Sequence, residues 1–433
     1  MARFIRHTPH IAAGVFFLFI VGIVGLYHGL AMAQKAEAQA DWVAEIEKIF
    51  IRSEDCKQCH DRHYEEWKGA REQTPDLKTF GRVDAALLHG TSLESPVFRT
   101  VLGVWLQTGP TADERRRCLS CHVPSTTVFP QHADKIVAQV LSGKPQVEGI
   151  GCASCHLIKQ VEQTPNFPPS FKIEPGKMIY GPYANPEENL VHPATQSELF
   201  RGANYCASCH FDKVKDVMQK DLPGEILQGT ICQDCHMEPS TGSSTSKRGA
   251  MTRTIGRHWF RGVVVPGALI KNRNLQAEWM PRLDLEASKS ASAVEGTALV
   301  RIGSLPHSFP DGDPVLKQFY LVITVKDAQG KVLKEETKQF GLPYDKILRG
   351  SIPDPFIKGG HTRKVPFSLA VPSGSAAASI EAVLNYALIP TPEPALKGKY
   401  LATLSTDKER ESAKKIFDEY TQVRLLTYRV KSL

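Results

Sequence analysis

Five copies of the motif Cys-x-x-Cys-His contain every cysteine of this chain. The copies are Cys56, Cys59 and His60; Cys118, Cys121 and His122; Cys152, Cys155 and His156; Cys206, Cys209 and His210; and Cys232, Cys235 and His236. Two thiols at this spacing can form thioether bonds to the two vinyl groups of one haem, and the adjacent histidine then binds the iron as its proximal ligand. The sequence therefore predicts five covalently bound c-type haems.

Two other uses of paired cysteines explain this pattern less well. Structural zinc sites also use Cys-x-x-Cys pairs, but they do not require a histidine directly after each pair. Five disulfides in an exported protein would use all ten cysteines, yet they would leave those histidines unexplained. We therefore interpret all ten cysteines as haem-attachment residues.

The composition is that of an ordinary globular protein of two or three domains, with 433 residues, 42% hydrophobic and 23% charged. The formal net charge is +7, but the basic residues are scattered and form no long run. This distribution argues against a nucleic-acid-binding tail, so we expect no nucleic-acid partner. A mild positive charge is compatible with an acidic redox partner.

The N-terminal segment has the features of an export signal or a membrane anchor. A short basic stretch with Arg3 and Arg6 precedes the apolar run Ile11–Leu26. Ala31–Ala33 resembles a cleavage site, whereas the following sequence could continue a membrane helix. We favour an uncleaved anchor in the inner membrane, with the haems on the periplasmic side. If the segment is cleaved, we expect an exported protein that is soluble or extracellular.

We expect an α+β multidomain protein with an N-terminal apolar helix, a mostly α and loop haem-packed domain and a C-terminal β domain. The expected boundaries are 1–33 for the export signal or anchor, 34–50 for a helical spacer, 51–270 for the pentahaem domain and 271–433 for the β domain. Within the pentahaem domain, the serine-rich and threonine-rich run Pro239–Lys247 is expected to be a flexible loop.

Short alternating or β-branched runs predict a small antiparallel β-sandwich in the C-terminal part. The runs are Ala298–Ile302, Phe319–Val325, Lys364–Val371 and Ser379–Ala387. The stretch Ala328–Lys331 has the composition of a hairpin turn. One late helix is expected at Asp407–Tyr420, followed by a last strand near Val423–Val430.

The sixth ligand of each iron decides between electron transfer and chemistry, because a second histidine closes the iron whereas an open position can bind a substrate. The candidates are His63, His89, His132, His192, His258, His307 and His361. They are sufficient for a second histidine on every iron. On a helix, His63 would lie near the haem of its own motif but not on the opposite face of that iron.

Several segments resemble a multihaem family related to the tetrahaem cytochrome that accepts electrons from hydroxylamine oxidoreductase. The resemblance covers roughly residues 54–390 and rests on CHDRHYEEW, EGIGCASCH, HPATQSELFRGANYCASCH, ICQDCHM, RHWFRG and SLPHSFPDGDPVLKQFYLVITVKDAQGKV. It implies a mostly α haem-packed domain, a C-terminal β domain, and distal histidines at His89, His192, His258 and His307.

One departure from that family leaves a ligand open. Similar members place Ser-x-His just after Tyr-x-x-Trp, where this chain has Gly69–Arg71. We take His89 as the displaced equivalent. The remaining distal ligand could then be His132 or His63, could come from another subunit of an oligomer, or could be missing, which would leave that iron open.

Electron transfer between a membrane redox complex and an exported partner protein is the leading functional hypothesis. The β domain would be a docking module or a lid that donates His307. The first alternative is an enzyme with one open haem that acts on a nitrogen or sulfur compound. The second alternative is a subunit of an extracellular cytochrome filament. The sequence leaves open whether the protein is an enzyme, and it favours a carrier.

Overall fold

The computed structural model describes residues 42–68, 89–161, 171–173, 178–187, 191–202, 206, 209–210, 232–237, 239–258, 260, 281–303, 318–341, 344–346, 357, 359–372, 376–387, 389–420 and 424–433. The chain divides into two compact units, Met1–Ile51 and Arg52–Leu433. The apolar run Ile11–Leu26 lies outside the described residues. Within the described residues, no helix is both long and apolar enough to cross a membrane.

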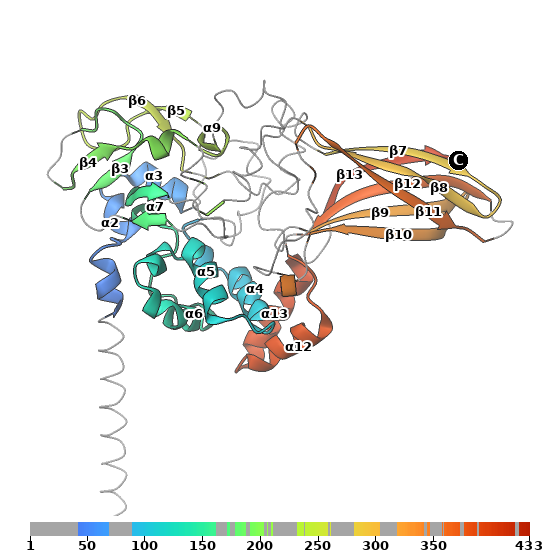
Figure 1. Ribbon diagram of the computed structural model, residues 1–433, viewed down its shortest axis with the longest axis horizontal. Coiled ribbons are helices and arrows are strands. Elements are labelled where there is room, and N and C mark those ends of the chain that lie inside the picture. Colours follow the sequence, from blue (N-terminus) through green and yellow to red (C-terminus); the bar gives the residue numbers. More distant parts are fainter. Residues whose placement is uncertain are drawn as a thin grey trace, which may run out of the picture. The chain divides into compact units, whose positions relative to one another are not determined.

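In the first unit, residues 42–47 are helical and lie within the expected spacer. The second unit contains helices and several sheets (Figure 1), so the expected α+β multidomain class is confirmed. The helices of its haem-motif region are α2 (Ser53–Lys57), α3 (Asp61–Trp67), α4 (Pro96–Leu106), α5 (Ala112–His122), α6 (Ala133–Leu141), α7 (Cys152–His156) and α9 (Cys232–His236). The strands there are β1 (Ile158–Val161), β2 (Phe171–Ile173), β3 (Ile179–Gly181), β4 (Ala194–Gln196), β5 (Pro239–Gly242) and β6 (Arg253–Gly256).

Local sequence signals explain where the longer helices of this region begin. Ser95 accepts a hydrogen bond from the Val97 amide at 3.1 Å and so caps α4. Thr111 and Glu114 form a capping box, in which each side chain accepts from the backbone amide of the other. Because α5 starts at this box, it delivers the second haem motif at its C-terminal end.

Two C-terminal helices contact α4. They are α12 (Pro394–Thr403) and α13 (Asp407–Tyr420). The helix predicted at Asp407–Tyr420 is confirmed as α13, whereas α12 was not predicted. The tyrosine ring of Tyr400 on α12 lies directly against Gly103 of α4, and its hydroxyl hydrogen-bonds Thr100. The contact therefore depends on the absence of a side chain at position 103.

Gly103→Ala is expected to lower the free energy of unfolding by about 1–3 kcal/mol, because the new methyl group would overlap the Tyr400 ring. Gly398→Ala in α12 is the matched control, since no atom lies near the methyl group that it adds. The control should be neutral or slightly stabilising, because alanine is the better helix former. Urea unfolding of both variants measures the difference, and equal stabilities would show that the α4–α12 contact does not constrain position 103.

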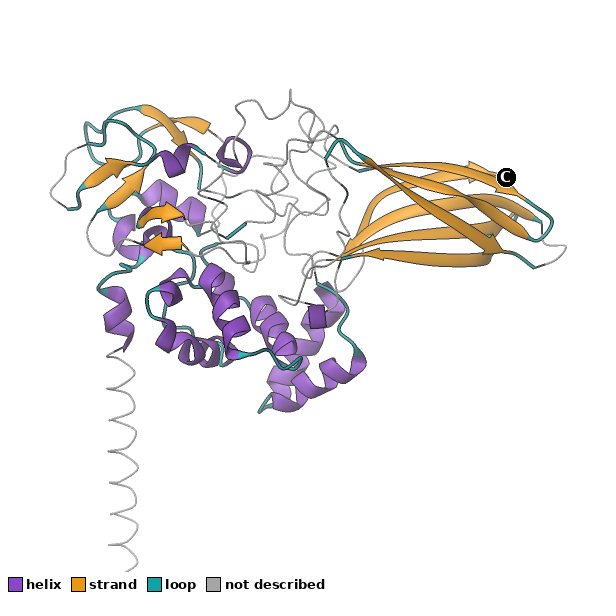
Figure 2. Ribbon diagram, in the orientation of Figure 1, coloured by secondary structure: helices purple, strands orange, loops and turns teal. Residues whose placement is uncertain are grey.

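The β domain consists of two antiparallel sheets, whose strands are orange in Figure 2. The two sheets share one apolar core. One sheet has the order β10-β9-β12-β13 and the other β11-β8-β7. The strands are β7 (Arg282–Lys289), β8 (Ala293–Arg301), β9 (Gln318–Asp327), β10 (Val332–Phe340), β11 (Thr362–Ala370), β12 (Ala377–Ala387) and β13 (Arg424–Ser432). Alternate residues of β9, namely Leu321, Ile323 and Val325, are fully buried in this core.

The runs predicted as strands all fall on observed strands, each within a few residues of the expected bounds. The predicted hairpin turn connects β9 to β10, and Gly330 adopts the positive φ of 81° that such a turn requires. The sandwich also contains β7, which was not predicted from the sequence.

Candidate haem-binding site

The first and third haem motifs lie side by side. Ser53, at the start of α2, is fully buried, and its hydroxyl accepts from the Cys152 amide at 2.8 Å while donating to Glu148 Oε2 at 2.8 Å. The Cys56 thiol hydrogen-bonds the Cys152 sulfur, so an attachment cysteine of each motif meets the other. The described cysteine side chains form no disulfide. These contacts place two expected haem positions next to each other.

The Tyr-x-x-Trp segment of α3 strengthens this connection. Tyr64 and Trp67 are both buried, with their ring centres 5.5 Å apart. The Tyr64 hydroxyl bonds Glu54 of α2, and the Trp67 indole N–H donates to the Ile150 carbonyl at 2.9 Å. Because Ile150 lies just before the third motif, α3 ties the helix of the first motif to the start of the third.

The fourth and fifth motifs are also neighbours. Cys206 and Cys232 share a side-chain hydrogen bond. Gln233, inside the fifth motif, donates to the carbonyls of Phe200 and Gly202 at 3.2 and 3.1 Å. The Gln233 side chain of the fifth motif therefore holds the backbone segment that leads into the fourth motif.

Three motif histidines each face one of the candidate distal histidines. The ring centres are 6.3 Å apart for His60 and His192, 6.3 Å for His156 and His258, and 6.1 Å for His89 and His210. With a metal–imidazole bond of about 2 Å and a nitrogen roughly 1.1 Å from its ring centre, two ligands on one iron have centres roughly 6 Å apart. The chain thus holds three histidine pairs at the separation that a haem iron requires.

Backbone carbonyls fix the tautomer of three of these histidines. Nδ1 of His60 lies 2.6 Å from the Ser244 oxygen, Nδ1 of His156 lies 2.7 Å from the Tyr180 oxygen, and Nδ1 of His258 lies 3.1 Å from the Gly256 oxygen. A carbonyl oxygen can only accept, so each Nδ1 carries the proton and each Nε2 keeps its lone pair. This is the arrangement of metal-binding histidines, whose second nitrogen donates to a neighbouring acceptor.

Burial keeps these imidazoles neutral, as metal ligation requires. Burial, followed by the charge of neighbouring histidines, lowers the pKa of His89 and His258 to about 3 each. Burial, with a smaller effect of His210, lowers the pKa of His122 to about 4. The electrostatic influence of His210 on both His89 and His122 also shows that the second and fourth motifs are close.

His122, the histidine of the second motif, has different neighbours from the paired histidines. Among the described residues, no histidine ring contacts His122, and the ring of Phe98 on α4 lies 4.7 Å from it. His132 is buried beside Phe129, with ring centres 6.1 Å apart. His307, the expected distal ligand in the β domain, lies outside the described residues. Within the described part of the chain, His89 and His210 thus influence His122 electrostatically but make no ring contact with it.

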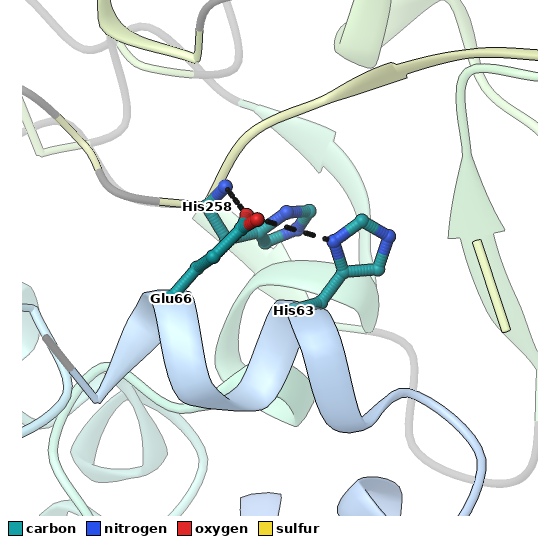
Figure 3. A group of neighbouring side chains, drawn as sticks. All are labelled: His63, Glu66 and His258. Carbon is teal, nitrogen blue, oxygen red and sulfur yellow. Dashed lines mark hydrogen bonds and ion pairs between the residues drawn. The ribbon is translucent and has the colours of Figure 1, made fainter. Parts of the chain in front are cut away.

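His63 lies between two of the histidine pairs. Its ring centre is 6.5 Å from that of His60 and 4.4 Å from that of His258. Figure 3 shows it beside His258 and beside Glu66, a carboxylate that was not predicted as part of the site. Nδ1 of His63 is 3.9 Å from Glu66 Oε2, which is too long for a hydrogen bond. His63 therefore interacts with the Glu66 carboxylate electrostatically, without a hydrogen bond.

Comparison with known proteins agrees with this geometry. Residues 55–157 match the family described as cytochrome c554 and c-prime. A solved penta-heme cytochrome c552 from Thermochromatium tepidum is 18% identical, aligns over 89% of this chain and 99% of that chain, and gives a TM-score of 0.50. This likeness shows a shared fold.

Other comparisons add no functional information. A β-glucuronidase of glycoside hydrolase family 2 is 13% identical over 29% of this chain and 11% of that chain, with a TM-score of 0.15 that carries no argument. No curated protein matches significantly. The family match over residues 55–157, the shared fold and the repeated Cys-x-x-Cys-His motifs together support a multihaem c-type cytochrome that binds iron in covalently attached haem.

Proposed function

We propose that this protein is a pentahaem electron carrier, with one haem on each motif. The observation that carries the proposal is the set of three histidine pairs with ring centres 6.1–6.3 Å apart. Haem iron with two histidine ligands cycles between two oxidation states and offers no position to a substrate. The polypeptide supplies the axial ligands, their tautomers and their spacing.

In this proposal, His192 serves the first haem, His258 the third and His89 the fourth, each opposite the proximal histidine that it faces. His307 remains a proposed distal ligand on the strength of the sequence resemblance, which does not say which haem it serves. The ring of Phe260 supports a continuous chain, because its centre lies 5.7 Å from that of His258 and 4.6 Å from that of His89. It thus connects ligands of the third and fourth haems.

The backbone at Phe260 supports a role for this ring. Phe260 has a positive φ of 45°, which is unusual for a bulky residue. Such a conformation persists where the surroundings impose it, and it occurs preferentially at functional sites. The edge-on contacts with both histidines are the surroundings that the structure shows.

His192→Ala is expected to leave the haem content unchanged and to convert one haem from low spin to high spin, because the first iron loses its second strong ligand. Electron paramagnetic resonance of the oxidised protein and carbon monoxide binding to the reduced protein measure this change. His361→Ala is the control, since that ring bonds only the Gly359 carbonyl in the turn before β11. An unchanged spectrum of His192→Ala would remove His192 from the ligand set.

A second candidate function is an oxidoreductase acting on a nitrogen or sulfur compound at an open iron. The specific observation in its favour is the contact of His122 with Phe98, whereas three of the other four motifs have a histidine pair. If the second iron is open, the unmodified reduced protein should bind one equivalent of carbon monoxide. Absence of any carbon monoxide shift would exclude this candidate.

We also propose that electrons pass between a membrane redox complex and an exported protein on the periplasmic side, with residues 1–33 as an inner-membrane anchor. The support is the basic and apolar N-terminal sequence. A partner of the hydroxylamine oxidoreductase type rests on the sequence resemblance alone. Membrane fractionation followed by N-terminal sequencing tests the anchor. An intact Met1–Ala33 in the membrane fraction would exclude an extracellular filament, whereas a cleaved soluble protein would contradict the anchor.

A further inference from the structure

Glu66 is a buried carboxylate whose two oxygens are both occupied. Its exposed fraction is 4%, and it projects from α3 toward the backbone at His258 (Figure 3). Oε2 accepts a hydrogen bond from the His258 backbone amide at 2.8 Å. Oε1 forms an ion pair with Arg257 Nε at 2.6 Å and accepts from Arg62 Nε at 3.0 Å. One carboxylate thus connects α3 to two consecutive residues of a segment far along the chain.

The charges around Glu66 argue against a separate metal-ion site. Donor atoms of His63, Glu66 and His258 lie within 4.8 Å of one another, which is compatible with a small metal cluster. However, two guanidinium groups already neutralise the single carboxylate. Both Glu66 oxygens are thus engaged, by Arg62, Arg257 and the His258 amide, so Glu66 acts as an anchor for this segment.

The anchor acts on the backbone of a proposed iron ligand. Glu66 fixes the amide of His258, while the Gly256 carbonyl fixes Nδ1 of the same ring. Arg62 also donates to the Ser240 hydroxyl of β5 at 3.3 Å. Arg62 thus links the Glu66 carboxylate to β5. Both the backbone and Nδ1 of His258 are thus held, and its ring lies 6.3 Å from that of His156 with the ring planes 23° apart.

We propose that Glu66 is the positioning residue that holds His258 as the distal ligand of the third haem. This proposal rests on the proposed function, because it requires His258 to ligate iron. It assigns Arg62 and Arg257 the role of holding the Glu66 carboxylate in this orientation. In this proposal α3, which directly follows the first haem motif, also supports a ligand of the third haem.

The test compares Glu66→Ala, Glu66→Gln and Glu65→Ala in the full-length, haem-loaded protein. Glu65 is the matched control, since it is the neighbouring glutamate on α3 and its exposed side chain pairs only with Lys57. The readouts are haem per chain, the electron paramagnetic resonance spectrum of the oxidised protein, and carbon monoxide binding to the reduced protein.

We expect Glu66→Ala to keep the haem content but to convert one low-spin haem, wholly or in part, to a high-spin form that binds carbon monoxide. Glu66→Gln should give a smaller high-spin fraction, because its amide oxygen can still accept from the His258 amide. Glu65→Ala should match the unmodified protein. If Glu66→Ala fails to accumulate with haem, the spin state of Glu66→Gln relative to Glu65→Ala decides the question.

His258→Ala separates the positioning role from the ligand assignment. If His258→Ala produces no high-spin haem, the assignment of His258 as a ligand fails, and the positioning proposal fails with it. If His258→Ala produces one but both Glu66 variants keep the unmodified spectrum, only the positioning proposal is overturned. In the double variant Glu66→Ala with His258→Ala, a single high-spin haem is expected, because both changes act on one iron.

Discussion

Replacing both cysteines of the third motif, as Cys152→Ala with Cys155→Ala, is expected to reduce the haem content from five per chain to four. Covalent attachment needs both thiols, and the remaining His156 alone cannot retain the cofactor through a covalent bond. The haem-to-protein ratio, measured from the haem absorbance and the iron content of denatured protein, reports the change. The same ratio measured for Ser154→Ala is the control.

The control keeps the motif while removing a buried hydroxyl from its centre. Ser154 donates to the Gly149 carbonyl at 3.2 Å, so its loss costs stability without removing a thiol. We expect Ser154→Ala to retain five haems. A cysteine double variant with the haem content of the unmodified protein would show that this motif does not attach haem.

Ser53→Ala is expected to lower the free energy of unfolding by about 2–4 kcal/mol, because it leaves the Cys152 amide and the Glu148 carboxylate short of a buried partner. Ser142→Ala is the control, since its hydroxyl bonds only the nearby Gln139 carbonyl, and we expect a loss below about 1 kcal/mol. Chemical unfolding of the haem-loaded variants at neutral pH measures both values. Equal losses would contradict the role of Ser53 as the link between motifs.

The Ser53→Ala effect should depend on pH in a defined direction. Burial raises the Glu148 pKa, and hydrogen bonds from the Ser53 side chain and backbone partly offset this rise. When folding raises the pKa of a carboxyl, that carboxyl contributes stability at pH values below its unfolded pKa, and this contribution is lost as the pH rises through its folded pKa. The Ser53 hydroxyl opposes this loss because it donates a hydrogen bond to the ionised carboxylate. Its removal should therefore lower the free energy of unfolding more at neutral pH, where the carboxylate is ionised, than under acidic conditions. The opposite trend would contradict this assignment.

The sequence predicted well the features that depend on local spacing. The attachment motifs follow from ten cysteines in five identical spacings. The sandwich strands follow from alternation of apolar residues, because the period of a strand is visible within one run. The helix Asp407–Tyr420 follows from its charged, periodic sequence, whereas α12 was missed because it starts at Pro394 and contains Gly398.

The supporting residues of the site could not be predicted, because their roles arise from contacts between distant segments. Glu66 bonds a residue 192 positions away, and Ser53 bonds one 95 positions away. Nothing in the sequence next to either residue signals such a partner. The run Pro239–Lys247 was expected to be a flexible loop from its composition, but its first part, Pro239–Gly242, forms β5, and the Ser244 carbonyl in the rest of the run holds Nδ1 of His60.

The most direct test of the central claim is the haem count and spin state of the purified full-length protein, from iron analysis and electron paramagnetic resonance on one sample. Our account predicts five haem irons per chain, with low-spin signals from at least the three irons between the histidine pairs of His60, His156 and His210. Fewer than five haems, or a spectrum in which those three irons are high spin, would contradict it.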